Sequence, residues 1–325
     1  MKQQGFEDRF SGEWDAFEHW LEQRGKRSQS AVGGLSDAEV PRRYRRICQQ
    51  LALARDRRYG AAVIERLHTL ATRGHHVLYS SRAGRKSRFV AFVFGGFPRS
   101  VRAERRFVAL ALVLFMGPLL AMIALAGFYP DLVYYFLSPE QVAKFEHMYR
   151  ADAPRLGRIP EANSAFFMLG FYIWNNIKIA FQTFAGGLLF GVGSLFFLLF
   201  NGFFIGAVAG HLTYSGHFTP FYSFVAGHSA LELTAIVLSG AAGLKLGGAL
   251  IAPGQLSRKQ ALVVAARGAA AIIYGAAGML LLAAFVEAFW SPLTEVMPAL
   301  KYGVGITLWL LVICYFYLLG RGRGD

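Results

Sequence analysis

The sequence predicts an all-α, polytopic membrane protein with about six transmembrane helices and an N-terminal cytoplasmic helical region. Its 325 residues are 54% hydrophobic and 15% aromatic, and the mean hydropathy is +0.37. That composition differs from the composition of an ordinary soluble domain. Residues 184–212 form a run of about thirty residues without a formal charge, and roughly twenty apolar residues are enough to cross a bilayer.

Residues 1–88 form a basic region with the periodicity of amphipathic helices. Apolar residues recur at helical spacing from Phe6 to Leu21, from Val40 to Leu51 and again beyond Gly60, which predicts three helices. Residues 1–106 hold 22 Lys or Arg against 11 Asp or Glu. Lys and Arg accumulate on the cytoplasmic side of membrane proteins, so we expect this region to contact anionic lipids of the inner leaflet rather than nucleic acid.

Residues 89–106 are predicted to form an interfacial elbow helix. Their apolar part, residues 89–97, is too short to cross a bilayer, and Pro98 follows it. Arginines lie on both sides of the apolar part. A short apolar segment with basic flanks is typical of a helix that lies in the plane of the membrane surface.

A transmembrane domain follows, over residues 107–320. With the N-terminus in the cytoplasm, six spans place every charged turn on its expected side, the segment 129–163 outside and the tail 321–325 in the cytoplasm. The stretch 165–182 is polar for a span, and a re-entrant or interfacial helix there would leave five crossings. The six predicted spans are residues 107–128, 165–182, 184–212, 221–250, 262–287 and 300–319.

Glycines line one face of two of these spans. They stand three or four residues apart, a spacing that lets helix backbones approach closely in lipid. Asn201 lies beside the first face, where we expect it to bond across to a neighbouring helix. The two spans are therefore predicted to pack together, or one of them packs against its copy in a homodimer. The glycines concerned are Gly202, Gly206, Gly210, Gly240, Gly243 and Gly247.

The chain resembles the stage II sporulation protein M family in four stretches: FPRSVR at 97–102, NNIKIAFQTFAGGLLFG at 175–191, FNGFFIGAVAGHL at 200–212 and GHSALELTAIVLSGAAGLKLGGALIAPG at 227–254. The likeness covers about residues 97–320. It implies a multi-pass protein of the bacterial cytoplasmic (inner) membrane, with envelope proteins or MoxR-type ATPases as partners. It implies no chemical activity, and the long basic N-terminus argues against carrying over a role in sporulation.

The pair His228 and Glu232 is the first candidate for an intramembrane site. The two residues stand four apart on one helical face, and ionisable groups at membrane depth are costly unless they face protein or water. They could supply two metal ligands, with His211 or His217 as a third. The alternative that we favour is structural: Glu232 pairs with a buried cation and His228 hydrogen-bonds across a helix interface.

Three cations are available for that structural role, namely Lys178, Lys245 and Arg267. Lys178 also belongs to a polar cluster with Asn175 and Asn176. This cluster either forms a gate beside the glycine-rich span or ends a helix at the lipid headgroups.

These patterns favour a non-enzymatic membrane scaffold or assembly protein of the envelope. A channel or transporter with Glu232, His228, Asn175 and Lys178 along its path is the alternative, and a metal-dependent intramembrane enzyme is a third hypothesis. We expect no cofactor and no catalytic residue, because the sequence shows no Walker motif, nucleotide fingerprint or serine elbow.

Overall fold

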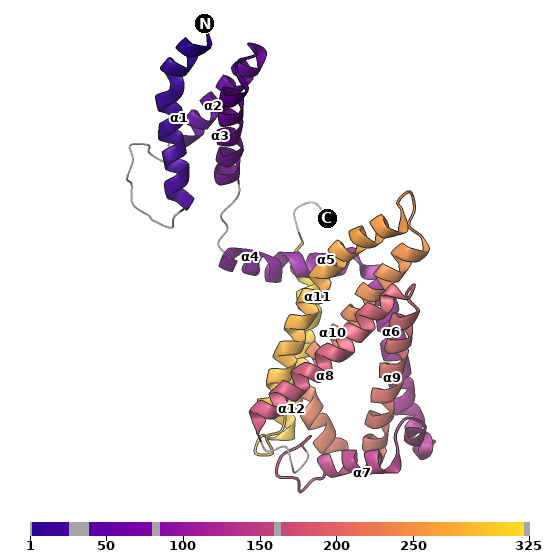
Figure 1. Cartoon of the computed structure of the whole chain (residues 1–325). Coiled ribbons are helices and arrows are strands. Elements are labelled where there is room, and N and C mark those ends of the chain that lie inside the picture. The colour runs from indigo at the N-terminus through magenta and orange to yellow at the C-terminus, as the bar shows by residue number, and fades with distance from the viewer. Residues whose placement is uncertain (1, 26–38, 80–84, 159–163, 322–325) are drawn as a thin grey trace. The chain divides into compact units, whose positions relative to one another are not determined.

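The computed structural model describes residues 2–25, 39–79, 85–158 and 164–321, and every secondary-structure element in these ranges is helical. The predicted all-α class is therefore confirmed. The chain divides into two compact units, Met1–Lys86 and Ser87–Asp325 (Figure 1). The boundary lies close to the predicted one at residue 88, and each unit is described here by itself.

The N-terminal unit is built from α1 (Gln3–Gly25), α2 (Val40–Asp56) and α3 (Ala61–Tyr79). Its core is aromatic: Phe6, Trp14 and Phe17 are at most 1% exposed. The indole nitrogen of Trp14 donates to Gln50 Oε1 at 2.7 Å, so the polar atom of the largest core side chain is satisfied.

Part of the basic charge of this unit is paired inside it. Arg43 and Arg46 of α2 both reach Glu13 of α1, at 3.6 and 3.1 Å. Arg66 of α3 forms ion pairs with Asp15 and Glu18 of α1. The acidic residues of α1 therefore hold the two basic helices around the aromatic core.

The predicted elbow consists of α4 (Arg85–Ala91), a π-helical turn η1 (Phe92–Gly96) and α5 (Phe97–Ala103). Phe97 is buried in the bundle, whereas Phe89 and Phe94 are 66% and 60% exposed. Arg102 donates to the carbonyls of Phe316 and Leu319 at the end of α12. The elbow therefore packs into the bundle through Phe92 and Phe97, while Phe89 and Phe94 present apolar side chains outward.

Five helices in the described part of the chain are long and apolar enough to cross a membrane. This confirms the prediction of a multi-pass membrane protein, and the number equals the lower of the two predicted counts. The five are α6 (Arg105–Ala126), α9 (Val192–Tyr214), α10 (Phe218–Ile251), α11 (Arg258–Phe289) and α12 (Pro298–Leu318).

The remaining candidate span is α8 (Ala165–Ala185), whose two asparagines and lysine lower its hydropathy. Its first turn places Phe166 against Phe289 at the end of α11, with ring centroids 5.4 Å apart. Its last turn accepts a 2.6 Å hydrogen bond at the carbonyl of Thr183 from Ser194, at the start of α9. The helix therefore runs from one end of the bundle to the other (Figure 1).

The contact between Arg102 and the end of α12 supports this path. This contact places α5 and the end of α12 at the same end of the bundle. That is possible only if an even number of helices runs along the bundle between them. The five apolar helices and α8 together make that even number. Helix α8 accordingly runs along the bundle, although its composition does not indicate a membrane span.

The segment between α6 and α8 contains the 3-10 helix η2 (Pro130–Tyr135) and α7 (Pro139–Met148). Ser138 and Gln141 form a capping box at the start of α7. Leu156 N donates to Pro292 O at 3.1 Å, which ties the segment to the connection between α11 and α12. The segment therefore covers this end of the bundle (Figure 1). Residues 159–163 lie outside the described residues, as do residues 322–325 of the predicted tail.

Both glycine faces are used inside the chain. A Cβ on Gly206 would lie 2.6 Å from Leu119 O, so the face of α9 packs on the backbone of α6. A Cβ on Gly243 would lie 2.7 Å from Phe184 O, so the face of α10 packs on the last turn of α8. It also packs on the connection to α9, which contains η3 (Gly186–Leu188). The other members pack likewise: Gly202 and Gly210 meet α6, Gly240 meets Leu198 of α9, and Gly247 meets Gly191.

One detail of the glycine prediction is wrong. Asn201 was expected to bond across to a neighbouring helix, but its amide nitrogen donates to Phe197 O at 2.7 Å, one turn back in α9. The close approach of α6 explains this difference, because the glycines beside Asn201 bring backbone rather than a polar side chain to that face.

Candidate functional site

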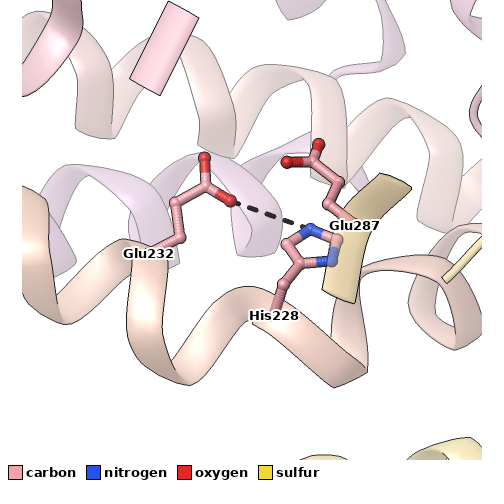
Figure 2. Close-up of side chains that lie close together, drawn as sticks. All are labelled: His228, Glu232 and Glu287. Carbon is pink, nitrogen blue, oxygen red and sulfur yellow. Dashed lines mark ion pairs between the residues drawn. The ribbon is translucent and has the colours of Figure 1, made fainter. Parts of the chain in front are cut away.

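Three ionisable side chains meet inside the transmembrane unit. His228 and Glu232 project from α10, and Glu287 projects from α11 (Figure 2). One nitrogen or oxygen atom from each lies within 4.8 Å of the others. The closest ionic contact is 3.7 Å, from His228 Nε2 to Glu232 Oε2.

Local sequence brings these residues together. The four-residue spacing places His228 and Glu232 on one face of α10, as predicted. Gly227 lets the end of α11 approach that face, because a Cβ on Gly227 would lie 2.6 Å from Cε3 of the Trp290 ring. Glu287 lies one turn before Trp290, and the helix therefore directs its carboxylate to the same place.

Neighbouring polar groups orient the three side chains. His228 Nδ1 lies 3.0 Å from Ser291 Oγ, and Lys301 Nζ donates to Ser291 O at 2.8 Å. Asn176 Nδ2 of α8 donates to Glu287 Oε2 at 3.5 Å. Four helices therefore contribute to the cluster, and the imidazole ring has a defined orientation.

A cavity of about 730 Å³ adjoins the cluster. Most of its lining is apolar and aromatic, and it comes from α6, α7, α9, α10 and α12 as well as the cluster residues themselves. His228 and Glu287 are buried, but 18% of the Glu232 side chain is exposed. An apolar cavity with a few convergent polar groups is the usual form of a ligand site.

Tyr149, which follows α7, closes one side of this cavity. Its ring contacts Phe224, with centroids 5.6 Å apart, and Phe224 contacts the ring of His228 at 5.3 Å. Burial raises the pKa of the Tyr149 hydroxyl well above its ordinary value, with smaller contributions from nearby Tyr172, Glu287 and Glu232. The hydroxyl therefore stays protonated next to the two carboxyl groups.

Arg158 is a buried cation at the same end of the bundle. Its Nη2 atom donates to Ala288 O at 2.6 Å, whereas Nε and Nη1 have no hydrogen-bond partner among the described residues. Burial, followed by repulsion from Arg155, lowers the pKa of this guanidinium. The contact of Arg158 with a carbonyl holds the segment after α7 on the last turn of α11.

The cations predicted to pair with Glu232 lie elsewhere. Lys245 binds Glu104 Oε1 at 2.5 Å, while Lys178 and Arg267 are exposed on the outside of the bundle. The residue that contacts Glu232 is His228. The predicted pairing with a lysine or arginine is therefore wrong among the described residues.

Neither histidine considered as a third metal ligand lies near His228. His211 contacts Glu146 of α7 at 2.8 Å, and His217 contacts Ser215 at 3.0 Å, so neither reaches His228. Of the polar cluster on α8, Asn176 reaches Glu287, and Asn175 donates to Asn176.

Sequence reasoning missed Glu287, Ser291 and Lys301. The predicted span 262–287 ended at Glu287, but α11 continues to Phe289. The apolar residues on both sides, AAFVEAFW, were the available signal for a buried carboxylate. Lys301 is 1% exposed in the first turn of α12, and its position inside a predicted span was a similar signal.

The fold and the buried cluster define a multi-pass, α-helical membrane protein with a polar centre. A family model described as stage II sporulation protein M matches residues 99–292, more than half of the chain. The chain belongs to this family, which confirms the resemblance seen in the sequence. A second model, a domain of unknown function (DUF8413), matches residues 4–80. No curated protein and no solved structure matches the chain.

Proposed function

We propose that this protein is a non-enzymatic scaffold of the bacterial envelope, held in the cytoplasmic membrane with its N-terminal unit in the cytoplasm. The observation that carries the proposal is the division of the chain. The N-terminal unit has its own aromatic core and matches its own family model, separate from the match of the transmembrane unit. A domain with its own core can in principle fold alone, which leaves its surface available to partners outside the membrane.

The exposed arginines of α2 supply a docking surface for such partners. Arg42 and Arg45 point to solvent, while Arg43 and Arg46 contact Glu13. Clustered cations attract acidic protein surfaces and anionic headgroups. The partner class that the family suggests is envelope proteins or MoxR-type ATPases. We also propose that the protein forms a homodimer.

The channel alternative receives less support. Its path was to include Lys178, whose side chain is exposed on the outside of the bundle. The buried ionisable residues His228, Glu232 and Glu287, with Asn176 of α8 beside them, lie next to an apolar cavity. A water-filled path would need polar groups along its length.

The test is co-purification of the tagged full chain from its host membrane in mild detergent. We expect envelope proteins to co-purify with the wild type and to be lost with the double variant Arg42→Glu and Arg45→Glu. The control is Arg258→Glu with Lys259→Glu, an equal charge change at the exposed start of α11, where an acidic residue suits the helix dipole. Recovery of the protein alone, together with normal envelope behaviour in a deletion strain, would overturn the proposal.

A further inference from the structure

We propose that His228, Glu232 and Glu287 bind one divalent transition-metal ion of the Zn²⁺ class, with a fourth ligand position open to the cavity. This inference goes beyond the scaffold role and does not depend on it. It assigns a ligand to a cluster that helix packing alone does not require.

The geometry of the three side chains fits one ion. Zn²⁺ lies about 2.0–2.2 Å from imidazole nitrogen and carboxylate oxygen, so tetrahedral ligands stand roughly 3.3–3.6 Å from one another. The separation between His228 Nε2 and Glu232 Oε2 is 3.7 Å, and the three potential ligand atoms lie within 4.8 Å of one another. Small rotations of two flexible glutamates would complete the set around the fixed imidazole (Figure 2).

The charge balance of the cluster favours a cation. Two carboxylates lie side by side in a bundle core, and neither forms an ion pair with a lysine or arginine in the described ranges. The nearby cations are occupied, since Lys301 donates to Ser291 O and Arg158 to Ala288 O. Buried charge without a partner is costly, and a divalent ion would balance both carboxylates.

The surrounding hydrogen bonds prepare the side chains for a metal. A proton on His228 Nδ1, donated to Ser291 Oγ at 3.0 Å, leaves the lone pair of Nε2 facing Glu232. Asn176 Nδ2 donates a hydrogen bond to Glu287 Oε2 at 3.5 Å and so orients this carboxylate. Metal-bound histidines commonly donate their second ring nitrogen to such a partner, and carboxylate ligands are themselves hydrogen-bonded.

The cavity supplies the open position and the route of entry. Glu232 is the most exposed of the three side chains and lines the cavity with the other two. Three protein ligands with an open fourth position are typical of reactive zinc sites, while structural sites are closed. One imidazole favours Zn²⁺, Co²⁺ or Fe²⁺ over Mg²⁺ and Ca²⁺, which prefer oxygen ligands only.

The competing arrangement has no metal, and the two carboxyl groups share a proton. The experiment that separates them uses the purified full chain in detergent, stripped with a chelator and titrated with Zn²⁺ by calorimetry. Elemental analysis after dialysis then gives the bound stoichiometry, and absorption bands of added Co²⁺ report the coordination geometry. We expect about one Zn²⁺ per chain, no competition from Mg²⁺, and tetrahedral Co²⁺ bands.

Variants locate the ion. His228→Gln, Glu232→Gln and Glu287→Gln should each weaken Zn²⁺ binding by at least about 100-fold, and Ser291→Ala by about 10–100-fold. The control is His211→Gln with Glu146→Gln, which removes a second histidine–glutamate contact of the same unit, 2.8 Å long and outside the cluster. This variant should bind Zn²⁺ like the wild type.

The proposal is overturned if the stripped wild-type chain takes up no Zn²⁺, if Mg²⁺ displaces Zn²⁺ at similar concentration, or if the control loses the ion as the cluster variants do. Glu232→Gln is the deciding variant, because its partly exposed side chain lines the cavity and its amide keeps the same size. A folded Glu232→Gln protein, checked by its elution volume, that retains full Zn²⁺ affinity would also overturn the proposal.

Discussion

The two units of this chain build their cores by opposite means. The N-terminal unit packs large aromatic side chains, with Phe6, Trp14 and Phe17 fully buried between three helices. The transmembrane unit instead packs backbone on backbone, where glycines of α9 and α10 meet carbonyls of α6 and α8. Its large aromatic side chains are often outside, as with Phe166 and Trp174, which are 76% and 70% exposed.

The difference follows from the solvent of each unit. In water, burying an aromatic side chain removes apolar surface from the solvent and stabilises the fold by roughly 1.5–3 kcal/mol. In lipid, acyl chains solvate aromatic side chains as well as the protein interior does, and close backbone approach becomes the main attraction between helices. Large aromatic side chains therefore gather in the core of the N-terminal unit, whereas in the transmembrane unit they lie both in the core, as Phe97 and Phe115 do, and on the surface.

The largest effect expected from this comparison is that of Gly187→Ala in the transmembrane unit. A Cβ there would lie 2.6 Å from the carbonyl carbon of Gly243. Its three nearest atoms all belong to the backbone of Gly243, which cannot move aside as a side chain can. We expect a loss of more than about 4 kcal/mol, beyond the usual cost of overpacking. Little monodisperse protein should be recovered after detergent extraction, and its melting temperature should fall sharply.

The matched control is Gly278→Ala in α11, where no heavy atom lies within 4 Å of the new Cβ. Alanine has the higher helix propensity, so this variant should be neutral or more stable by up to about 1 kcal/mol. If Gly187→Ala melted at the same temperature as Gly278→Ala, backbone packing would not be what holds the transmembrane unit together.

Sequence reasoning predicted the elements that local patterns determine. The three N-terminal helices follow from apolar spacing, and the glycine faces follow from residues such as Gly202 and Gly206 that stand one turn apart. The crossing of α8 stayed ambiguous because Asn175, Asn176 and Lys178 make it polar, and only its contacts at both ends decide its path.

The candidate site was only half predictable for a related reason. His228 and Glu232 share a helix face, so their proximity is a local property that the spacing indicates. Glu287 joins them through the packing of α11 on α10, and no pattern within either helix encodes that contact. His211 is closer to His228 in sequence than Glu287 is, but its position near the end of α9 directs it to Glu146 of α7.

A smaller effect is expected from Trp14→Ala in the N-terminal unit. The substitution removes a fully buried indole and leaves Gln50 Oε1 without its 2.7 Å hydrogen bond. Such a truncation costs about 3–5 kcal/mol, enough to unfold a small unit. Hydrogen exchange should lose protection in α1, α2 and α3, while amides of α9 and α10 remain protected.

Trp174→Ala is the counterpart in the transmembrane unit. Its side chain is 70% exposed on α8, so we expect protection to change in neither unit. Equal losses of protection from the two tryptophan substitutions would contradict the claim that exposed aromatic side chains such as Trp174 add little to the stability of the transmembrane unit.

The smallest effect is that of Arg66→Ala, which tests how much the ion pairs on the N-terminal unit add to its aromatic core. Arg66 contacts Asp15 and Glu18, but its side chain is 38% exposed and solvent screens the attraction. We therefore expect a loss of about 0.5–1 kcal/mol in chemical unfolding at low salt. The ionic part of this loss should disappear in 1 M NaCl, where the screening length is about 3 Å.

A remainder that persists in high salt would come from packing, since the Arg66 guanidinium lies 5.7 Å from the centre of the Trp14 ring. The exposed Arg42 gives the control, because Arg42→Ala should leave the unfolding free energy unchanged at either salt concentration. A loss from Arg66→Ala above about 2 kcal/mol at both salt concentrations would mean that this arginine belongs to the core. The core of the N-terminal unit would then include a charged side chain as well as aromatic ones. The difference from the backbone packing of the transmembrane unit would remain.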